Sequence, residues 1–179
     1  MTLKIGCAFA LMTLLAACGV MQTFSTSKYE DGEVPLPNNY RDWPKFLSAV
    51  QRPDVKQVRE IYVNPRGSKT QPGQPFANGT MFVMENYAAA LRGDGNPAQG
   101  PDGKLVKGNL IRVFVMSKNG GNGTKVAPEL KNGDWVYTSY DAAGNKTVDP
   151  LNACRTCHLP LAGKDYVQRY DEYFATRSK

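Results

Sequence analysis

Histidine is almost absent from this chain of 179 residues, which contains one, and cysteine is scarce, with four. A single histidine cannot ligate both axial faces of an iron, and it cannot form a multi-histidine metal site. Outside the N-terminal segment, no apolar run approaches the roughly 20 residues that a membrane-spanning helix needs. Basic and acidic residues interleave without a basic cluster or a nucleic-acid motif, so the net charge of +6 indicates a solvated surface and no nucleic-acid partner.

The one histidine ends the pentapeptide Cys154-Arg155-Thr156-Cys157-His158. C-x-x-C-H is the attachment motif of c-type haem, in which two thiols bond the haem vinyl groups and the histidine ligates the iron. A zinc site normally needs four ligands, and a redox dithiol normally follows a βαβ pattern, so both alternatives fit this segment poorly. The sequence therefore predicts one covalent haem c held by Cys154, Cys157 and His158. The opposite iron face can then carry methionine, lysine, water or a gas, or can stay open.

The N-terminal segment has the pattern of an export signal. A charged start at Lys4 precedes an apolar run from residue 5 to 15, and Leu15-Ala16-Ala17-Cys18 resembles a bacterial lipobox. We expect residues 1–17 to be a lipoprotein signal peptide and Cys18 to carry the lipid. We expect the polar residues 18–39 to form a tether and residues 40–179 to form the haem domain.

This signal predicts a location on the periplasmic side of a bacterial membrane, where haem c is attached. Gly19 after the lipidated cysteine favours the outer membrane. Because Cys7 leaves with the signal and the other three cysteines have roles, no cysteine remains for a disulfide. A periplasmic redox partner is expected.

Hydrophobic patterning in residues 40–179 predicts an α+β fold with a mainly antiparallel sheet. Asn-Gly turns between apolar runs are strong hairpin signals. The glycine-rich residues 88–109 are expected to form a loop, with one helical turn near its start. The pattern predicts helices at 40–51 and 164–174, and strands at 58–64, 80–87, 110–117 and 134–140.

Several segments in order resemble the cytochrome P-460 and cytochrome c-prime-beta family. They are residues 59–64 (REIYVN), 76–85 (FANGTMFVME), 110–116 (LIRVFVM) and the late haem motif. The resemblance covers roughly residues 40–175. It implies a largely antiparallel β fold, usually a homodimer, and a five-coordinate haem c.

Members of this family differ in the chemistry of the distal haem face. P-460 enzymes oxidise hydroxylamine with a haem that is cross-linked to a lysine, whereas c-prime-beta members bind nitric oxide or carbon monoxide over an apolar face. Aligned with the family, the cross-linking lysine falls on Met84, which cannot form that bond.

Strand alternation separates the candidate distal residues into two groups. Phe82 and Met84 share one face of their strand and are candidates for contact with the haem, with Met84 either ligating the iron or packing beside it. Glu85 lies on the opposite face and is the candidate for proton transfer, or simply faces water. Arg112 is a candidate partner of a haem propionate, with solvent exposure as its alternative.

Three functions remain open. The first is a cytochrome that binds nitric oxide or a related small molecule at an open distal face. The second is a hydroxylamine or nitric oxide oxidoreductase that retains P-460 chemistry. The third is a periplasmic electron carrier with Met84 or another residue as the sixth ligand.

Overall fold

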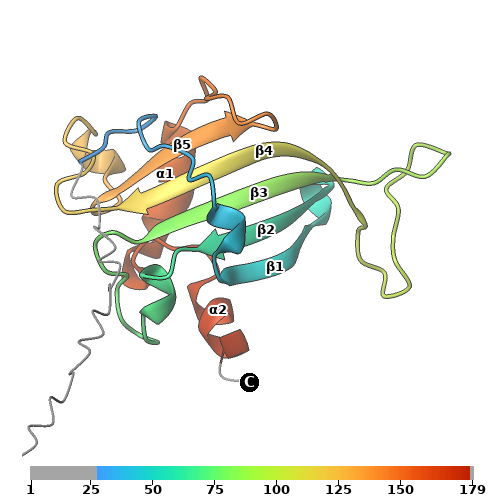
Figure 1. Ribbon diagram of the computed structural model, residues 1–179, viewed down its shortest axis with the longest axis horizontal. Coiled ribbons are helices and arrows are strands. Elements are labelled where there is room, and N and C mark those ends of the chain that lie inside the picture. Colours follow the sequence, from blue (N-terminus) through green and yellow to red (C-terminus); the bar gives the residue numbers. More distant parts are fainter. Residues whose placement is uncertain (1–27, 178–179) are drawn as a thin grey trace, which may run out of the picture.

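The computed structural model describes residues 28–177, so the predicted signal peptide and Cys18 lie outside the described residues. One five-stranded antiparallel sheet, with the strands in chain order, forms the centre of this part of the chain (Figure 1). The strands are β1 (Lys45–Arg52), β2 (Gln57–Val63), β3 (Met81–Ala89), β4 (Lys107–Lys118) and β5 (Trp135–Asp141). The helices are α1 (Asn152–His158) and α2 (Tyr170–Arg177), with short 3₁₀ helices η1 (Tyr40–Asp42), η2 (Pro53–Val55), η3 (Gly67–Lys69), η4 (Pro128–Leu130) and η5 (Leu159–Lys164).

The α+β class and the four predicted strands are confirmed. Strands β3 and β4 are longer than expected because their pairing continues to Ala89 and Lys107. The prediction of a helical turn near residue 87 is therefore wrong, because these residues pair in the sheet. The loop beyond it extends away from the sheet and is closed by isolated bridges at Leu91–Pro97 and Gln99–Leu105 (Figure 1).

The predicted helix at 40–51 is wrong, because only η1 is helical and residues 45–52 form β1. The register of β1 against β2 shifts twice, and Ala49 adopts a left-handed conformation with φ of 50°. Such bulges add residues between successive inward positions. They place Phe46, Leu47 and Val50 in the core at a spacing that imitates a helix.

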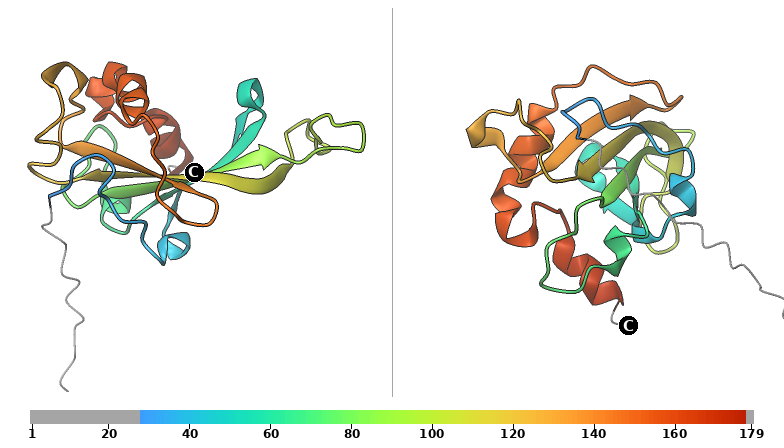
Figure 2. Two further views of the ribbon diagram at one scale, coloured as in Figure 1. Left: turned by 90° about the horizontal axis from the view of Figure 1, so that it is seen from above. Right: turned by 60° about the vertical axis from the view of Figure 1, so that its left-hand side comes forward.

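The sheet separates two layers. In the view from above, α1 and η5 lie on one side of the sheet and η1 on the other (Figure 2). We call these sides the α1 face and the far face. The α1 face carries an aromatic core of Phe46, Phe76, Phe82, Trp135 and Phe174, and the far face carries a smaller core built on valines and tyrosines.

Residues 28–39, which we assigned to the tether, pack against the domain. Val34 is fully buried, and its carbonyl accepts a hydrogen bond from the Tyr140 hydroxyl. The amide of Gly32 donates to the carbonyl of Tyr137 at 2.8 Å. The packed fold therefore begins N-terminal to Tyr40, because the segment supplies backbone partners to β5.

The C-terminal helix is interrupted. Helix η5 ends at Lys164, and α2 begins only at Tyr170. Asp165, Tyr166 and Arg169 between them have positive φ angles, a conformation that a continuous helix excludes. Within the described residues, no helix is long and apolar enough to cross a membrane.

Candidate haem site

The C-x-x-C-H motif forms almost all of α1. Residues three and four apart lie on the same face of a helix, so Cys154 aligns with both Cys157 and His158. Cys154 is half-buried and Cys157 exposed, and neither is in a disulfide. Burial raises the pKa of the Cys154 thiol to about 11, so this side chain is a thiol rather than a thiolate at neutral pH.

The ring of His158 is held by a hydrogen bond from Nδ1 to the carbonyl oxygen of Tyr166, at 2.6 Å. A carbonyl oxygen only accepts, so Nδ1 carries the proton and the lone pair of Nε2 is free for a metal. Burial lowers the pKa of His158, which favours the neutral, ligating form. This arrangement is typical of a histidine that ligates a metal.

Helix α1 is attached to the rest of the domain through Arg155, the residue after the first cysteine. Its side chain is 1% exposed and forms a two-pronged ion pair with Asp31, with nitrogen–oxygen distances of 2.6 and 2.8 Å. The guanidinium also donates to the carbonyl of Trp135 at 3.2 Å and lies over the ring of Tyr137. A variable position of the motif thus anchors the helix to β5 and to the N-terminal segment.

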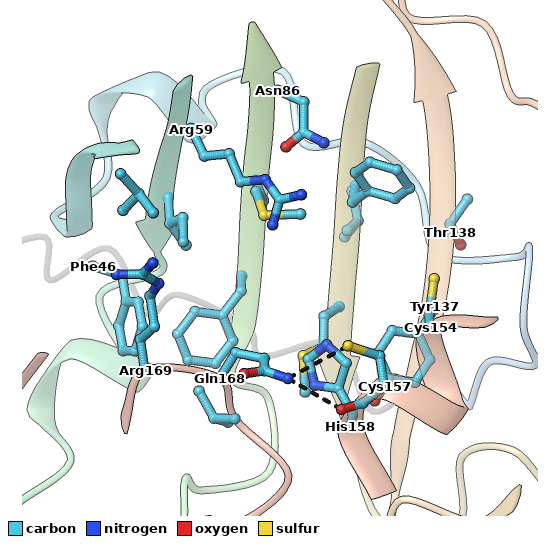
Figure 3. Close-up of a pocket in the computed structure, with 18 of the residues that line it drawn as sticks. Phe46, Arg59, Asn86, Tyr137, Thr138, Cys154, Cys157, His158, Gln168 and Arg169 are labelled. Atoms are coloured by element: carbon cyan, nitrogen blue, oxygen red, sulfur yellow. Dashed lines mark hydrogen bonds between the residues drawn. The ribbon is translucent and has the colours of Figure 1, made fainter. Parts of the chain in front are cut away.

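A cavity of about 670 Å³ lies between α1 and the α1 face of the sheet, and the two cysteines and His158 line it. Figure 3 shows Cys154, Cys157 and His158 at one end of this cavity, with Arg59 and Asn86 at the other. The volume falls within the range of about 300–1,000 Å³ usual for ligand and cofactor sites.

The floor of the cavity changes from apolar to polar along the strands. Phe82 and Met116 are paired across β3 and β4, and both line the cavity. The next row is Ile61, Met84 and Phe114, again paired and again lining it. In the row after that, Arg59 pairs with Asn86.

Three arginines line the cavity, and one of them has an unsatisfied donor. Arg52 is paired with Asp54, and Arg169 with Glu172. The Nε of Arg59 is buried without a hydrogen-bond partner, as is the Oδ1 of Asn86. Burial lowers the pKa of Arg59, and the charges of Arg52 and Arg169 add to this effect.

These residues fit a haem. A porphyrin is a flat apolar ring with two carboxylates at one edge, and the cavity is lined mainly by apolar and aromatic side chains, with Arg59 at the end opposite the motif (Figure 3). A buried donor without a partner is costly, and a carboxylate would satisfy it. The motif residues would hold the ring and the iron, and Arg59, whose Nε has no partner, would pair with a propionate.

The structure divides the predicted site residues between the two faces. Phe82 and Met84 line the cavity together with the motif residues. Glu85 is fully buried on the far face, where it accepts hydrogen bonds from three tyrosines and from Arg41. Arg112 is paired with Asp149 and is not among the residues that line the cavity.

These placements do not support the roles suggested for Glu85 and Arg112. The sheet separates the Glu85 carboxylate from the cavity, so Glu85 has no direct path for proton transfer to a molecule bound in the cavity. The guanidinium of Arg112 already has a carboxylate partner. The prediction that Met84 ligates the iron, and its alternative of packing, both remain predictions.

Arg59, Asn86 and Ile61 are among the cavity residues that sequence reasoning missed, as are Arg52 and Arg169. Strand alternation places Arg59 and Ile61 on one face of β2, but only the register with β3 shows that this face is the one that carries Met84. The carbonyl of Tyr166 was not predictable either, because backbone groups leave no signal in the residue types.

Fold and site together define a class of protein, an antiparallel β-sheet protein with a porphyrin-sized cavity closed by a C-x-x-C-H helix. The family model described as Cytochrome P460 matches residues 37–169, and the chain belongs to this family of haem-binding cytochromes. The match runs from the residues before η1 to the residue that precedes α2. A comparison with curated proteins found no match.

Proposed function

We propose that this chain is a mono-haem c-type cytochrome that binds nitric oxide or a related small molecule at an open, largely apolar distal face. Cys154 and Cys157 would attach the haem covalently, and His158 would be its proximal ligand. When bound, the haem supplies an iron with one coordination position for a ligand. The chain's own residues orient the imidazole, enclose the ring and limit the access of water.

The observation that carries this proposal is the composition of the cavity floor. Ile61, Met84 and Phe114 form its central row, and no lysine and no carboxylate belongs to the cavity lining formed by the described residues. The cross-linked haem of P-460 enzymes requires a lysine amine, and proton transfer from a substrate requires a base. An apolar chamber instead favours a small, uncharged ligand such as nitric oxide.

We further propose that the protein acts on the periplasmic side of a bacterial membrane, anchored by a lipid on Cys18. Electrons would come from a periplasmic redox partner, and two copies of the chain would associate as in other family members. The export pattern of residues 1–17 and the requirement of haem c attachment for an exported chain support this location.

The test is the ferrous absorption spectrum of protein matured in a host that assembles c-type haem, before and after addition of nitric oxide. We expect a high-spin haem c spectrum that shifts on adding the gas, and haem that stays with the protein under denaturing extraction. A Cys154→Ala, Cys157→Ala double variant is the control and should release its haem.

Other spectra would contradict the proposal in distinct ways. The red-shifted Soret band for which P-460 proteins are named would indicate a cross-linked haem and favour hydroxylamine oxidation. A low-spin spectrum that becomes high-spin in Met84→Leu would indicate methionine ligation and an electron carrier. Met84→Leu retains the size and apolarity of the side chain, so it isolates the sulfur.

A further inference from the structure

The hydrogen-bond acceptor of His158 lies in an unusual turn. Asp165 and Tyr166 both adopt left-handed backbone conformations, with φ angles of 50° and 60°. Aspartate tolerates this region, whereas a bulky residue such as tyrosine rarely enters it. Two such residues in succession persist only where the surrounding structure restrains them. The turn presents the Tyr166 carbonyl oxygen to Nδ1 of His158 at 2.6 Å.

The side chain of Asp165 supplies much of this restraint. Lys118, at the end of β4, contacts both carboxylate oxygens at 2.8 and 2.9 Å. The amide of Phe76, in the loop before β3, donates to Oδ2 at 2.8 Å. Both side chains of the ion pair are largely buried, with 14% of Lys118 and 13% of Asp165 exposed.

The backbone of Asp165 is restrained as well. Its carbonyl oxygen accepts a hydrogen bond from Nε1 of Trp135, a fully buried residue of β5, at 2.9 Å. Asp165 therefore joins the ends of β4 and β5 and the loop before β3 to the turn. All of these contacts are made by the residue that directly precedes Tyr166, whose carbonyl accepts the hydrogen bond from His158.

We propose that the Lys118–Asp165 ion pair is a positioning device for the proximal histidine. It holds the left-handed turn at Asp165 and Tyr166, and through it the carbonyl that orients the His158 ring and fixes its tautomer. Lys118 and Asp165 are thus positioning residues, since neither touches the haem ligand atoms. This inference rests on the proposed function in taking His158 as the iron ligand.

The expected consequence is electronic. A hydrogen bond from Nδ1–H to an acceptor makes the imidazole more basic and strengthens its bond to iron. If the turn relaxes, the carbonyl moves away, the imidazole donates less charge, and the iron–histidine bond weakens. The ferric state loses more stabilisation than the ferrous state, so the reduction potential rises.

The experiment is resonance Raman spectroscopy of the ferrous, haem-loaded full chain, with the reduction potential measured in parallel. Because the chain has one histidine, labelling with ¹⁵N-histidine identifies the iron–histidine band without ambiguity. In Asp165→Ala we expect this band to broaden and move to lower frequency, and the potential to rise. Asp165→Asn tolerates the left-handed conformation and can accept the Phe76 amide, so it should restore much of the wild-type band.

Glu60→Ala is the matched control. Glu60 is a largely buried carboxylate held by Lys45 and Lys107 at 2.9 and 3.2 Å, and strand alternation places it on the far face. It should lower stability without moving the iron–histidine band. A wild-type band in Asp165→Ala, or an equal shift in Glu60→Ala, would overturn the inference.

Two further results keep the outcomes separate. If Asp165→Ala does not mature, Lys118→Gln leaves the Phe76–Asp165 hydrogen bond in place and should shift the band in the same direction by less. An unchanged band there also overturns the inference. If the variants shift the band but the haem of the wild-type protein does not respond to nitric oxide, the result counts against the proposed function alone.

Discussion

The carboxylate of Glu85 is buried at the centre of the far face, where four side chains donate hydrogen bonds to it. The hydroxyls of Tyr40, Tyr87 and Tyr62 lie 2.7, 2.8 and 3.1 Å from its oxygens, and Nε of Arg41 lies at 2.8 Å. A carboxylate with this many donors is strongly satisfied, and its partners would be left without an acceptor if it were removed. At the scale of single residues, Glu85 therefore stabilises the fold.

We expect Glu85→Ala to lower the free energy of unfolding by about 2–5 kcal/mol at neutral pH, because it leaves the hydroxyls of Tyr40 and Tyr62 buried without their acceptor. Urea unfolding of the haem-loaded protein measures this loss. The control is Asp102→Ala, which removes the exposed pair with Lys104 and should cost no more than about 1 kcal/mol. Equal losses in the two variants would show that the buried network adds no stability.

The same network predicts a dependence on pH. Burial acts to raise the pKa of Glu85, but hydrogen bonds from Tyr40, Tyr87 and Arg41 outweigh it and hold the pKa below its ordinary value. The stabilisation is then present above the unfolded-state pKa of about 4.3 and lost as pH falls through the lower folded-state value. The stability difference between wild type and Glu85→Gln should therefore shrink on acidification below about pH 4. Unfolding titrations over this range measure it, and a constant difference would contradict the assignment.

Among the elements, β1 is shaped by a bulge rather than by its residue preferences. Ala49 is exposed and has a φ of 50°, which costs about 1–2 kcal/mol for a residue with a Cβ. The bulge allows three apolar side chains of β1 to reach the core despite their irregular spacing.

Ala49→Gly should raise the free energy of unfolding by about 1 kcal/mol, because glycine adopts this conformation without steric cost. Ser48→Gly is the matched control, since Ser48 is exposed in the same strand but has no positive φ. It should lower stability by roughly 0.5–1 kcal/mol. Thermal unfolding measures both, and two changes of the same sign would argue against the bulge.

The ion pair between Asp31 and Arg155 connects two elements, the N-terminal segment and α1. Asp31→Ala would leave the guanidinium of Arg155 buried without its charge partner, and we expect a loss of about 3–5 kcal/mol. Asp31→Asn keeps part of the hydrogen bonding and should lose less. Denaturant unfolding compares the two variants. An Asp31→Ala variant as stable as the wild type would show that the N-terminal segment does not anchor α1.

At the scale of the whole molecule, the candidate haem site combines a cavity with a buried hydrogen-bond donor that has no protein partner. The cavity separates α1 from the sheet, and Nε of Arg59 is buried in its lining without a partner. A bound group that fills the cavity and accepts from Arg59 stabilises the folded state over the unfolded one.

This predicts that one substitution has opposite effects in the two forms of the protein. Arg59→Met should stabilise the haem-free chain by about 1–3 kcal/mol, because it removes an unsatisfied buried donor. In the haem-loaded protein it should destabilise, because a propionate partner is lost. Thermal unfolding of both forms, with Arg52→Met as the comparison for an arginine that is already paired, tests the prediction. Stabilisation in both forms would show that Arg59 does not contact the haem.

The sequence by itself determined the features that depend on local patterns. C-x-x-C-H predicted the haem ligands because adjacent residues on one helical turn converge on one group. Alternation in β3 separated Phe82 and Met84 from Glu85, since side chains in a strand point to opposite faces in turn. The Asn-Gly turns predicted an antiparallel sheet, and the family resemblance agreed with it.

Only the tertiary structure decided the features that depend on contacts between distant residues. The bulge at Ala49 exists because β1 pairs with β2 in a shifted register, and the helix-like spacing of its apolar residues concealed this. The carbonyl of Tyr166 reaches His158 because Lys118, from β4, holds Asp165 in a turn that its own segment does not favour. Arg59 joins the cavity through its register with Asn86. Backbone strain and strand register are maintained by long-range packing, and the residue types of a short segment do not encode either one.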